Sequence, residues 1–263
     1  MIFFRDEGNG EPVLLVHGLG ASGRIFDHLF EARDPAQRLV AFDLPRTARS
    51  GHWARSRPDE IADRVVELMG ERGLSSVHLF GHSFGGLVCL SLAARWPHLA
   101  KSLTVVAAPA VGLPIDLRLL LDHPLTELSY ALLGRTPAWR PMLHAYLDYI
   151  WGRPGLLTAA QKAVYEEAQR AEGFGAGVLE ALRAIGRFRL DTEALRSASF
   201  PKTVLWGDRD PLVAVGQGAA FARSIDAQFE VIEGVGHCLP DERPDLVVAA
   251  VARCLPPRVD EAA

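Results

Sequence analysis

The chain has 263 residues, of which 49% are hydrophobic and 23% charged, and its formal net charge is −4. This length suits a single α/β unit, and the composition excludes a disordered or fibrous chain. The balance of 28 basic and 32 acidic residues argues against the strongly basic surface that nucleic acids and anionic membranes attract.

Neither the first residues nor the cysteines indicate secretion. The segment Met1–Glu7 lacks a basic stretch, and its apolar run is too short for a signal peptide or a membrane span. The three cysteines, Cys89, Cys238 and Cys254, have no paired spacing and fit a reducing compartment better than a disulfide framework. We therefore expect a cytoplasmic protein.

Short apolar runs alternate with longer segments of helical period, which is typical of βαβ units around a largely parallel sheet. Ile2–Arg5 and Val13–Val16 flank Gly8-Asn9-Gly10, and this pattern predicts an opening hairpin. Further apolar runs predict buried strands at Leu39–Phe42, Val77–Phe80, Leu103–Ala107, Thr203–Trp206 and Phe229–Ile232. Periodicity predicts helices at Pro58–Met69, Phe84–Trp96 and Pro244–Leu255.

The stretch from about Gly112 to Ser199 breaks this alternation. It has no convincing strand and predicts four or five helices, with helix starts at Thr136-Pro137 and at a capping box over Thr158–Gln161. We interpret residues 112–199 as a helical cap inserted into a core made of residues 1–111 and 200–263. The alternative is that the stretch adds further core helices.

The first chemical motif is Gly81-His82-Ser83-Phe84-Gly85, a G-x-S-x-G between a predicted strand and a predicted helix. A serine hydroxyl becomes a useful nucleophile when a sharp turn exposes it and a base removes its proton. Side chains at the two glycines would collide with the neighbouring backbone. The motif alone is weak, but its placement predicts Ser83 as the nucleophile, with His82 on the opposite face of the strand as a structural residue.

The second motif, His17-Gly18-Leu19-Gly20, follows the strand Val13–Val16. Acyl transfer develops negative charge on a carbonyl oxygen, which two preorganised N–H groups can stabilise. We assign these donors to the backbone of Phe84, directly after the nucleophile, and of Leu19. The alternative for this motif is a glycine-rich turn with a packed histidine.

An acid and a base follow two later strands. Asp208 and Asp210 both lie just after Thr203–Trp206, where open parallel sheets bind ligands, and Asp210 is favoured because it lies further along the loop. His237 follows Phe229–Ile232. The order Ser83, Asp210, His237 is the chain order of one class of serine hydrolase, and it differs from the order in chymotrypsin-like and subtilisin-like proteases.

These four motifs, taken in order, resemble those of the α/β-hydrolase family over nearly the whole chain. The resemblance implies an α/β fold with a mostly parallel central sheet, helices on both faces and a lid where residues 112–199 lie. It implies the triad of Ser83, Asp210 and His237, because the family's catalytic aspartate is the later one in such a loop. Glu242-Arg243-Pro244 resembles the end of the family's histidine loop.

Two features depart from the family pattern. Family members carry Asp-x-x-Gly-x-Gly after an early strand, whereas Arg46 and Ala48 replace both glycines after Asp43. We expect this loop to take another path, with Arg46 or Arg49 either solvated or placed near the pocket mouth as an anion contact. The second departure is a short N-terminus that lacks the family's first strand, an edge element.

The residues predict an acyl-enzyme hydrolase of carboxylic esters with small to medium apolar acyl groups. The alternatives are a carbon–carbon hydrolase of ring-cleavage products, a lactonase, a thioesterase, or a non-catalytic receptor on the same fold. No motif indicates a metal or cofactor. An acyl-carrier protein is conceivable as a partner, but residues 112–199 contain about as many acidic as basic residues and show no basic face.

Overall fold

The computed structural model describes residues 1–110, 112, 119, 121–123, 125–126, 129, 136, 138–152, 155 and 157–253. In this part of the chain, seven strands form one sheet in the order β1-β3-β2-β4-β5-β6-β7, and every pairing except β1 with β3 is parallel. The strands are β1 (Phe4–Glu7), β2 (Glu11–Val16), β3 (Gln37–Phe42), β4 (Val77–His82), β5 (Ala100–Val106), β6 (Lys202–Gly207) and β7 (Gln228–Ile232).

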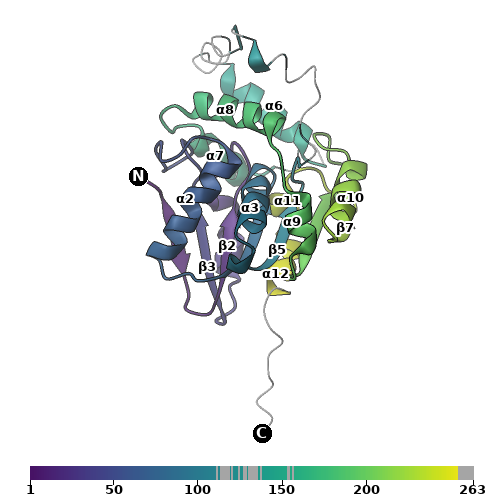
Figure 1. The fold of residues 1–263 in the computed structure, drawn as a ribbon. Coiled ribbons are helices and arrows are strands. Elements are labelled where there is room, and N and C mark those ends of the chain that lie inside the picture. The colour runs from purple at the N-terminus through teal and green to yellow at the C-terminus, as the bar shows by residue number, and fades with distance from the viewer. Residues whose placement is uncertain are drawn as a thin grey trace.

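Helices cover both faces of the sheet, with α2 and α3 on one face and α1 and α12 on the other (Figure 1). The helices of the described chain are η1 (Gly23–Phe26), α1 (Asp27–Glu31), α2 (Pro58–Glu71), α3 (Phe84–Arg95), η2 (Pro97–Leu99), α6 (Trp139–Ile150), α7 (Ala159–Ala168), α8 (Phe174–Arg187), α9 (Thr192–Ser197), α10 (Val215–Ser224), α11 (Leu239–Glu242) and α12 (Pro244–Ala252). The predicted α/β fold class is confirmed. Within the described ranges, no helix has the length and apolar character needed to cross a bilayer.

The predicted opening hairpin is wrong. β1 pairs antiparallel with β3, while β2 lies between β3 and β4. The glycines between β1 and β2 are needed because this segment lies directly against the backbone at the start of β3. A Cβ on Gly8 would lie 2.2 Å from the Gln37 carbonyl oxygen, and a Cβ on Gly10 would lie 1.9 Å from the Ala36 carbonyl oxygen. β2 is an apolar strand that must be covered on both faces and both edges, which places it inside the sheet. No described strand lies beyond β1 at that edge.

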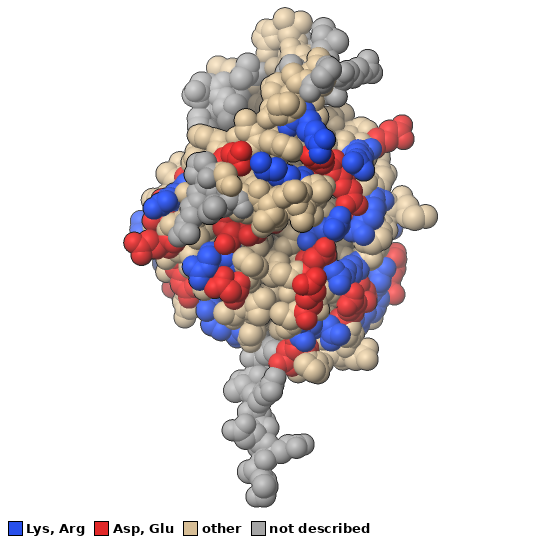
Figure 2. Space-filling view, turned by 180° about the vertical axis from the view of Figure 1, so that it is seen from behind, with Lys and Arg blue, Asp and Glu red and all other residues tan. Residues whose placement is uncertain are grey.

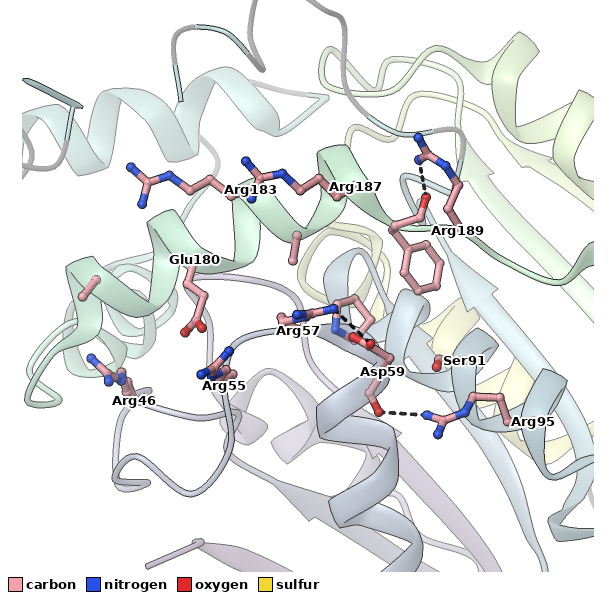
Figure 3. Close-up of a pocket in the computed structure, with 14 residues that line it drawn as sticks. Arg46, Arg55, Arg57, Asp59, Ser91, Arg95, Glu180, Arg183, Arg187 and Arg189 are labelled. Carbon is pink, nitrogen blue, oxygen red and sulfur yellow. Dashed lines mark hydrogen bonds and ion pairs between the residues drawn. The ribbon is translucent and has the colours of Figure 1, made fainter. Parts of the chain in front are cut away.

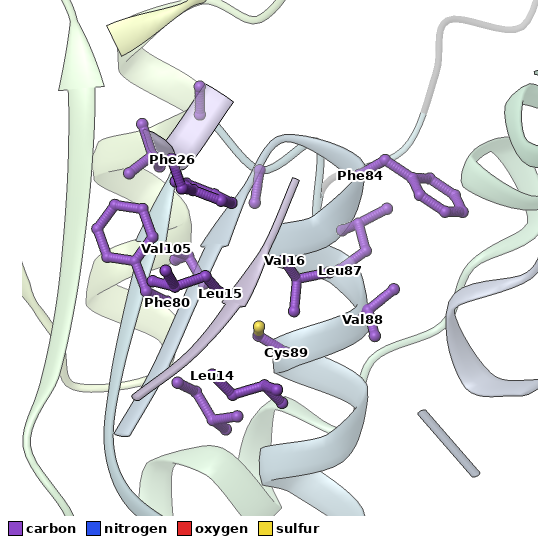
Figure 4. Packing of buried hydrophobic residues seen from close by; sticks show 14 of the residues in the cluster. Leu14, Leu15, Val16, Phe26, Phe80, Phe84, Leu87, Val88, Cys89 and Val105 are labelled. Carbon is purple, nitrogen blue, oxygen red and sulfur yellow. The ribbon is translucent and has the colours of Figure 1, made fainter. Parts of the chain in front are cut away.

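The core is centred on β2 and α3. Leu14, Leu15 and Val16 are at most 3% exposed, and they lie among apolar side chains of α3 and the neighbouring strands (Figure 4). Cys89 of α3 is fully buried, as its position on an apolar helix predicts. Each such Leu-sized side chain contributes about 1.5–3 kcal/mol by leaving water. The packing therefore fixes the end of β2 against the start of α3.

Four described helices, α6 to α9, lie between β5 and β6 in the chain, and no described residue between 112 and 199 is in a strand. α6 and α8 extend above the sheet in Figure 1. The capping box is confirmed, because the Thr158 side chain accepts from the Gln161 N–H and the Gln161 side chain accepts from the Thr158 N–H. The predicted helix start at Thr136-Pro137 falls partly on residues outside the described ranges. The division into cap and core stays a prediction.

Charged side chains of both signs alternate over the face shown in Figure 2, without a large area of one sign. Charged side chains of the described chain form partly exposed ion pairs, such as Asp6 with both Arg38 and Arg72. This mixed surface agrees with the small net charge.

Replacing Gly85 by alanine should strongly destabilise the protein. The added Cβ would lie 2.2 Å from the Val16 carbonyl oxygen and 2.4 Å from that of His17, and neither can move without shifting β2. We expect the free energy of unfolding, measured by urea denaturation, to fall by about 3 kcal/mol. Gly70→Ala in α2 is the control. No atom lies within 4 Å of its Cβ position, so the helix should gain up to about 1 kcal/mol. Equal losses in the two variants would contradict the steric account.

Candidate active site

Ser83 occupies a strained turn between β4 and α3. Its φ of 51° and ψ of −118° are unfavourable for a residue with a side chain. The turn holds because the Ser83 N–H donates to the Val106 carbonyl at 2.7 Å, and because Gly81 and Gly85 allow backbone to approach where a Cβ would clash. The predicted need for these two glycines is confirmed. The turn presents the Ser83 side chain at the carboxyl end of the sheet.

The structure brings Ser83, His237 and Asp210 into one hydrogen-bonded series. His237 Nε2 lies 2.8 Å from Ser83 Oγ, and His237 Nδ1 lies 2.8 Å from Asp210 Oδ2. A carboxylate can only accept, so Nδ1 carries the proton and Nε2 is left as the acceptor for the serine hydroxyl. The His237 and Asp210 side chains are 6% and 0% exposed, which keeps bulk water from competing for these bonds.

Asp210, and not Asp208, contacts His237. The second oxygen of Asp210 accepts from the N–H groups of Leu212 and Val213 at 2.8 and 3.1 Å, which orients the carboxylate. Asp208 instead accepts from the Gly234 N–H at 2.7 Å and so ties its loop to the chain that leads to His237. The two aspartates therefore have separate structural tasks.

Leu19 and Phe84 line the same small cavity, of about 10 Å³, next to the serine turn. In the described chain, neither backbone N–H donates to another group. His17, at the start of the loop, is fully buried and serves as a structural anchor. Its Nδ1–H donates to the Gly18 carbonyl at 2.8 Å, and its Nε2 accepts from the Leu44 N–H at 2.9 Å. Burial lowers the pKa of His17, so the ring stays neutral in this role.

His82 has a role that the sequence did not reveal. The side chain is buried, its Nε2–H donates to the His237 carbonyl at 2.9 Å, and the two rings lie 5.4 Å apart. Burial, reinforced by the nearby His237, lowers the pKa of His82 to about 3, so the ring is neutral. His82 is thus structural, as predicted, and it holds the backbone of the residue that faces Ser83.

The loop that carries His237 is also fastened to the end of α6. The His237 N–H donates to the Ile150 carbonyl at 2.8 Å, and Glu242 accepts from the N–H groups of Gly236 and Gly152 at 3.0 Å. A Cβ on Gly152 would lie 2.4 Å from the Gly236 nitrogen. Burial raises the pKa of Glu242, while these N–H groups oppose the change. The sequence identified Glu242 as part of a motif that follows His237, but only the folded chain shows that its carboxylate joins Gly236 to Gly152.

In the loop after β3, the two residues that replace the family's glycines have positive φ, the conformation that glycine adopts most readily. Arg46 and Ala48 have φ values of 57° and 46°, so these dihedrals give no support to the expected change of path. The two arginines then diverge. Arg49 contacts Asp43 at 3.3 Å and lies over the Phe3 ring, whereas Arg46 lines the small cavity beside Leu19 and Phe84.

A second buried cluster lies next to His237. The Tyr165 hydroxyl donates to Asp241 Oδ2 at 2.5 Å, joining α7 to α11. Burial is the main cause that raises the pKa of Asp241 to about 7, with Glu242 adding to the effect and the Tyr165 hydrogen bond opposing it. Cys238 is 2% exposed, as predicted, and burial also raises the pKa of its thiol.

Replacing Asp241 by asparagine should stabilise the protein increasingly as the pH rises from about 4 to about 7. The folded-state pKa lies above the ordinary 3.8, so the folded protein binds more protons than the unfolded chain and wild-type stability falls through this window. Asparagine does not titrate, and its oxygen can still accept from Tyr165. Urea denaturation should show the difference between variant and wild type growing by about 1 kcal/mol or more.

The matched control for this prediction is Asp245→Asn. The hydrogen bond from Arg243 lowers the pKa of Asp245, so a small change of opposite sign is expected for this exposed residue. A difference between Asp241→Asn and wild type that stays constant with pH would contradict the assignment of Asp241 as a carboxyl that folding protonates.

The chain is similar to known proteins over most of its length. A model described as "Alpha/beta hydrolase family" matches residues 13–250. Lipase 3 from Moraxella sp. is 26% identical over 242 residues, covering 88% of this chain and 73% of the lipase. An esterase structure from Thermogutta terrifontis has a TM-score of 0.81 at 23% identity, covering 96% of this chain and 92% of that one.

Another relative is longer. The dihydrolipoyllysine-residue acetyltransferase component of an acetoin cleaving system from Pseudomonas putida is 26% identical over 243 residues. The match covers 90% of this chain and 61% of that protein, so the chain spans less than two thirds of its length.

Proposed function

Because the chain belongs to the alpha/beta hydrolase family, we propose that it is a serine hydrolase that cleaves carboxylic esters with small to medium apolar acyl groups. The observation that carries this proposal is the hydrogen-bonded series from Ser83 Oγ through His237 to Asp210, with both contacts at 2.8 Å. The lipase and the esterase named above support the same class of reaction.

Acylation follows from the protonation states already described. His237 Nε2 takes the proton of Ser83 Oγ as this oxygen attacks the ester carbonyl, and Asp210 stabilises the imidazolium that forms. The N–H groups of Leu19 and Phe84 stabilise the oxyanion. The first turn of α3 adds the positive end of a helix dipole at the same place. The imidazolium then protonates the departing alcohol, leaving an acyl-enzyme.

Deacylation reverses these roles. A water molecule loses a proton to His237 Nε2 and attacks the acyl carbonyl, and the proton returns to Ser83 as the acid leaves. The small cavity beside Leu19 and Phe84 is also lined by Phe174 and Val178 of α8, and it measures only about 10 Å³. This mostly apolar lining beside the serine turn supports an apolar acyl group.

The other activities predicted from the sequence use the same three residues. Lactonases, thioesterases and carbon–carbon hydrolases also need a nucleophile, a base and an oxyanion site. These enzymes differ in the bond that they break. The substrates tested must therefore include a lactone and a thioester as well as simple esters. A protein that binds such ligands without turnover would instead be a receptor on this fold.

Wild-type protein should hydrolyse p-nitrophenyl esters with short to medium acyl chains, and Ser83→Ala should remove this activity. The alanine has no oxygen to acylate, while the fold should persist because φ near 51° is already tolerated by a side chain at this position. Release of p-nitrophenol is followed by absorbance over a series of acyl lengths, with circular dichroism as the folding control. An inert, folded wild type would refute the ester-hydrolase proposal.

Asp210→Asn should lower kcat by about 10⁴-fold, because the amide favours the wrong imidazole tautomer. Asp208→Asn is a matched control only two residues away. Its side-chain oxygen can still accept from the Gly234 N–H, so kcat should stay within about threefold of wild type, equivalent to under 1 kcal/mol. If both variants lost activity equally, Asp210 would have no special role as the acid.

A further inference from the structure

The backbone that follows α6 lies directly against the backbone that leads into His237. A Cβ on Gly236 would lie 2.2 Å from the Gly152 nitrogen, and a Cβ on Gly152 would lie 2.4 Å from the Gly236 nitrogen. Across the same contact, the His237 N–H donates to the Ile150 carbonyl at 2.8 Å. Residues 150–152 therefore run beside residues 236–237 only because both close positions are glycines. We call this contact the α6 junction.

The carboxylate of Glu242 joins the two sides of the α6 junction. One of its oxygens accepts from the Gly152 N–H at 3.0 Å, and both oxygens lie 3.0 Å from the Gly236 nitrogen. In the described chain, neither N–H donates to any other group. Hydrogen bonds to an ionised acceptor are stronger than those between neutral groups. Without Glu242, two packed backbone donors would lose their partner.

The position of Gly236 determines where the imidazole of the next residue lies. That ring must meet two partners at once, because Nδ1 of His237 lies 2.8 Å from Asp210 and Nε2 lies 2.8 Å from Ser83 Oγ. His82 holds the carbonyl of His237 from the other side of the loop. Proton transfer between positioned groups needs hydrogen-bond geometry, and a small displacement of one group costs much of the rate.

We propose that Glu242 is a positioning residue for His237, and that it acts by joining Gly236 to Gly152 through hydrogen bonds and not through its charge. The backbone after α6 then belongs to the support of the base, although it lies in the segment between β5 and β6. This inference rests on the proposed function, because it concerns the base of the same reaction.

The first test removes the acceptor and then restores it without the charge. Glu242→Ala should lower kcat for a p-nitrophenyl ester by about tenfold or more with KM unchanged, since only proton transfer is affected. In Glu242→Gln, the amide oxygen can replace the oxygen that accepts from both N–H groups, so kcat should stay within about fivefold of wild type. Equal losses in the two variants would contradict the hydrogen-bonding role and overturn the inference.

A second variant disturbs the same contact from the other side. The Cβ of Gly152→Ala would overlap the Gly236 nitrogen, so this variant should also lower kcat by about tenfold while Glu242 is intact. Combining it with Glu242→Ala should cost little more than the larger single loss, because both changes act through one contact. If the two losses multiplied, Glu242 and Gly152 would act independently and the inference would be wrong.

Tyr165→Phe is the control for a general loss of stability. It removes the hydrogen bond to Asp241, the residue next to Glu242, without touching the α6 junction. The midpoint of urea denaturation should fall, while kcat should stay within about threefold of wild type. An equal loss of kcat in Tyr165→Phe and Glu242→Ala would mean that any loosening of this region slows the reaction, and it would overturn the specific role of Glu242.

The rate of labelling by a fluorophosphonate separates this inference from the proposed function. The reagent forms a bond between Ser83 Oγ and phosphorus and releases fluoride, and the serine proton must pass to His237 without any ester being cleaved. Glu242→Ala should be labelled about tenfold more slowly than wild type, and Glu242→Gln at nearly the wild-type rate. Ser83→Ala should not be labelled.

The outcomes for the two proposals are distinct. If no ester is hydrolysed but labelling follows this pattern, the role of Glu242 stands and the ester-hydrolase proposal fails. If esters are hydrolysed and Glu242→Ala matches wild type in both kcat and labelling rate, the proposed function stands and the inference is wrong. A folded wild type that neither hydrolyses esters nor reacts with the fluorophosphonate would overturn both.

Discussion

The contact of α3 with the ends of β2 and β4 is the constraint on which the site depends. The helix starts so close to the sheet that a Cβ on Gly85 would overlap the carbonyl oxygens of Val16 and His17. This approach holds Ser83 at positive φ and keeps Leu19 and Phe84 beside one cavity. The buried apolar packing of β2 and α3 stabilises the strained turn, because the turn cannot relax without separating them.

The base is held by a different part of the molecule. His237 is held by hydrogen bonds to residues far away in sequence: its carbonyl accepts from His82, and its N–H donates to the Ile150 carbonyl. Glu242 then links Gly236 to Gly152. The helices between β5 and β6 therefore help to position the imidazole, in addition to covering the carboxyl end of the sheet. Changes in that segment should affect His237 even where they touch no substrate.

Charge is arranged unevenly around the site. A nearly balanced composition gave no reason to expect a basic surface, and residues 112–199 taken alone show none. The fold nevertheless places seven arginines and only two carboxylates along one cavity of about 690 Å³ (Figure 3). The local charge there differs from the average of the chain. Electrostatic recognition of a substrate depends on that local arrangement and not on the net charge.

Local sequence determined the elements and the positions where chemistry could occur. Strand runs ending at Phe80, Trp206 and Ile232 placed Ser83, Asp210 and His237 at the carboxyl edge of a parallel sheet, since parallel strands share one direction. Tertiary structure decided what periodicity cannot encode. Only the folded chain showed β1 pairing with β3, which of two nearby aspartates meets the imidazole, and which arginines line one cavity. These outcomes depend on contacts between residues far apart in sequence, and a local sequence pattern does not indicate which distant residues come into contact.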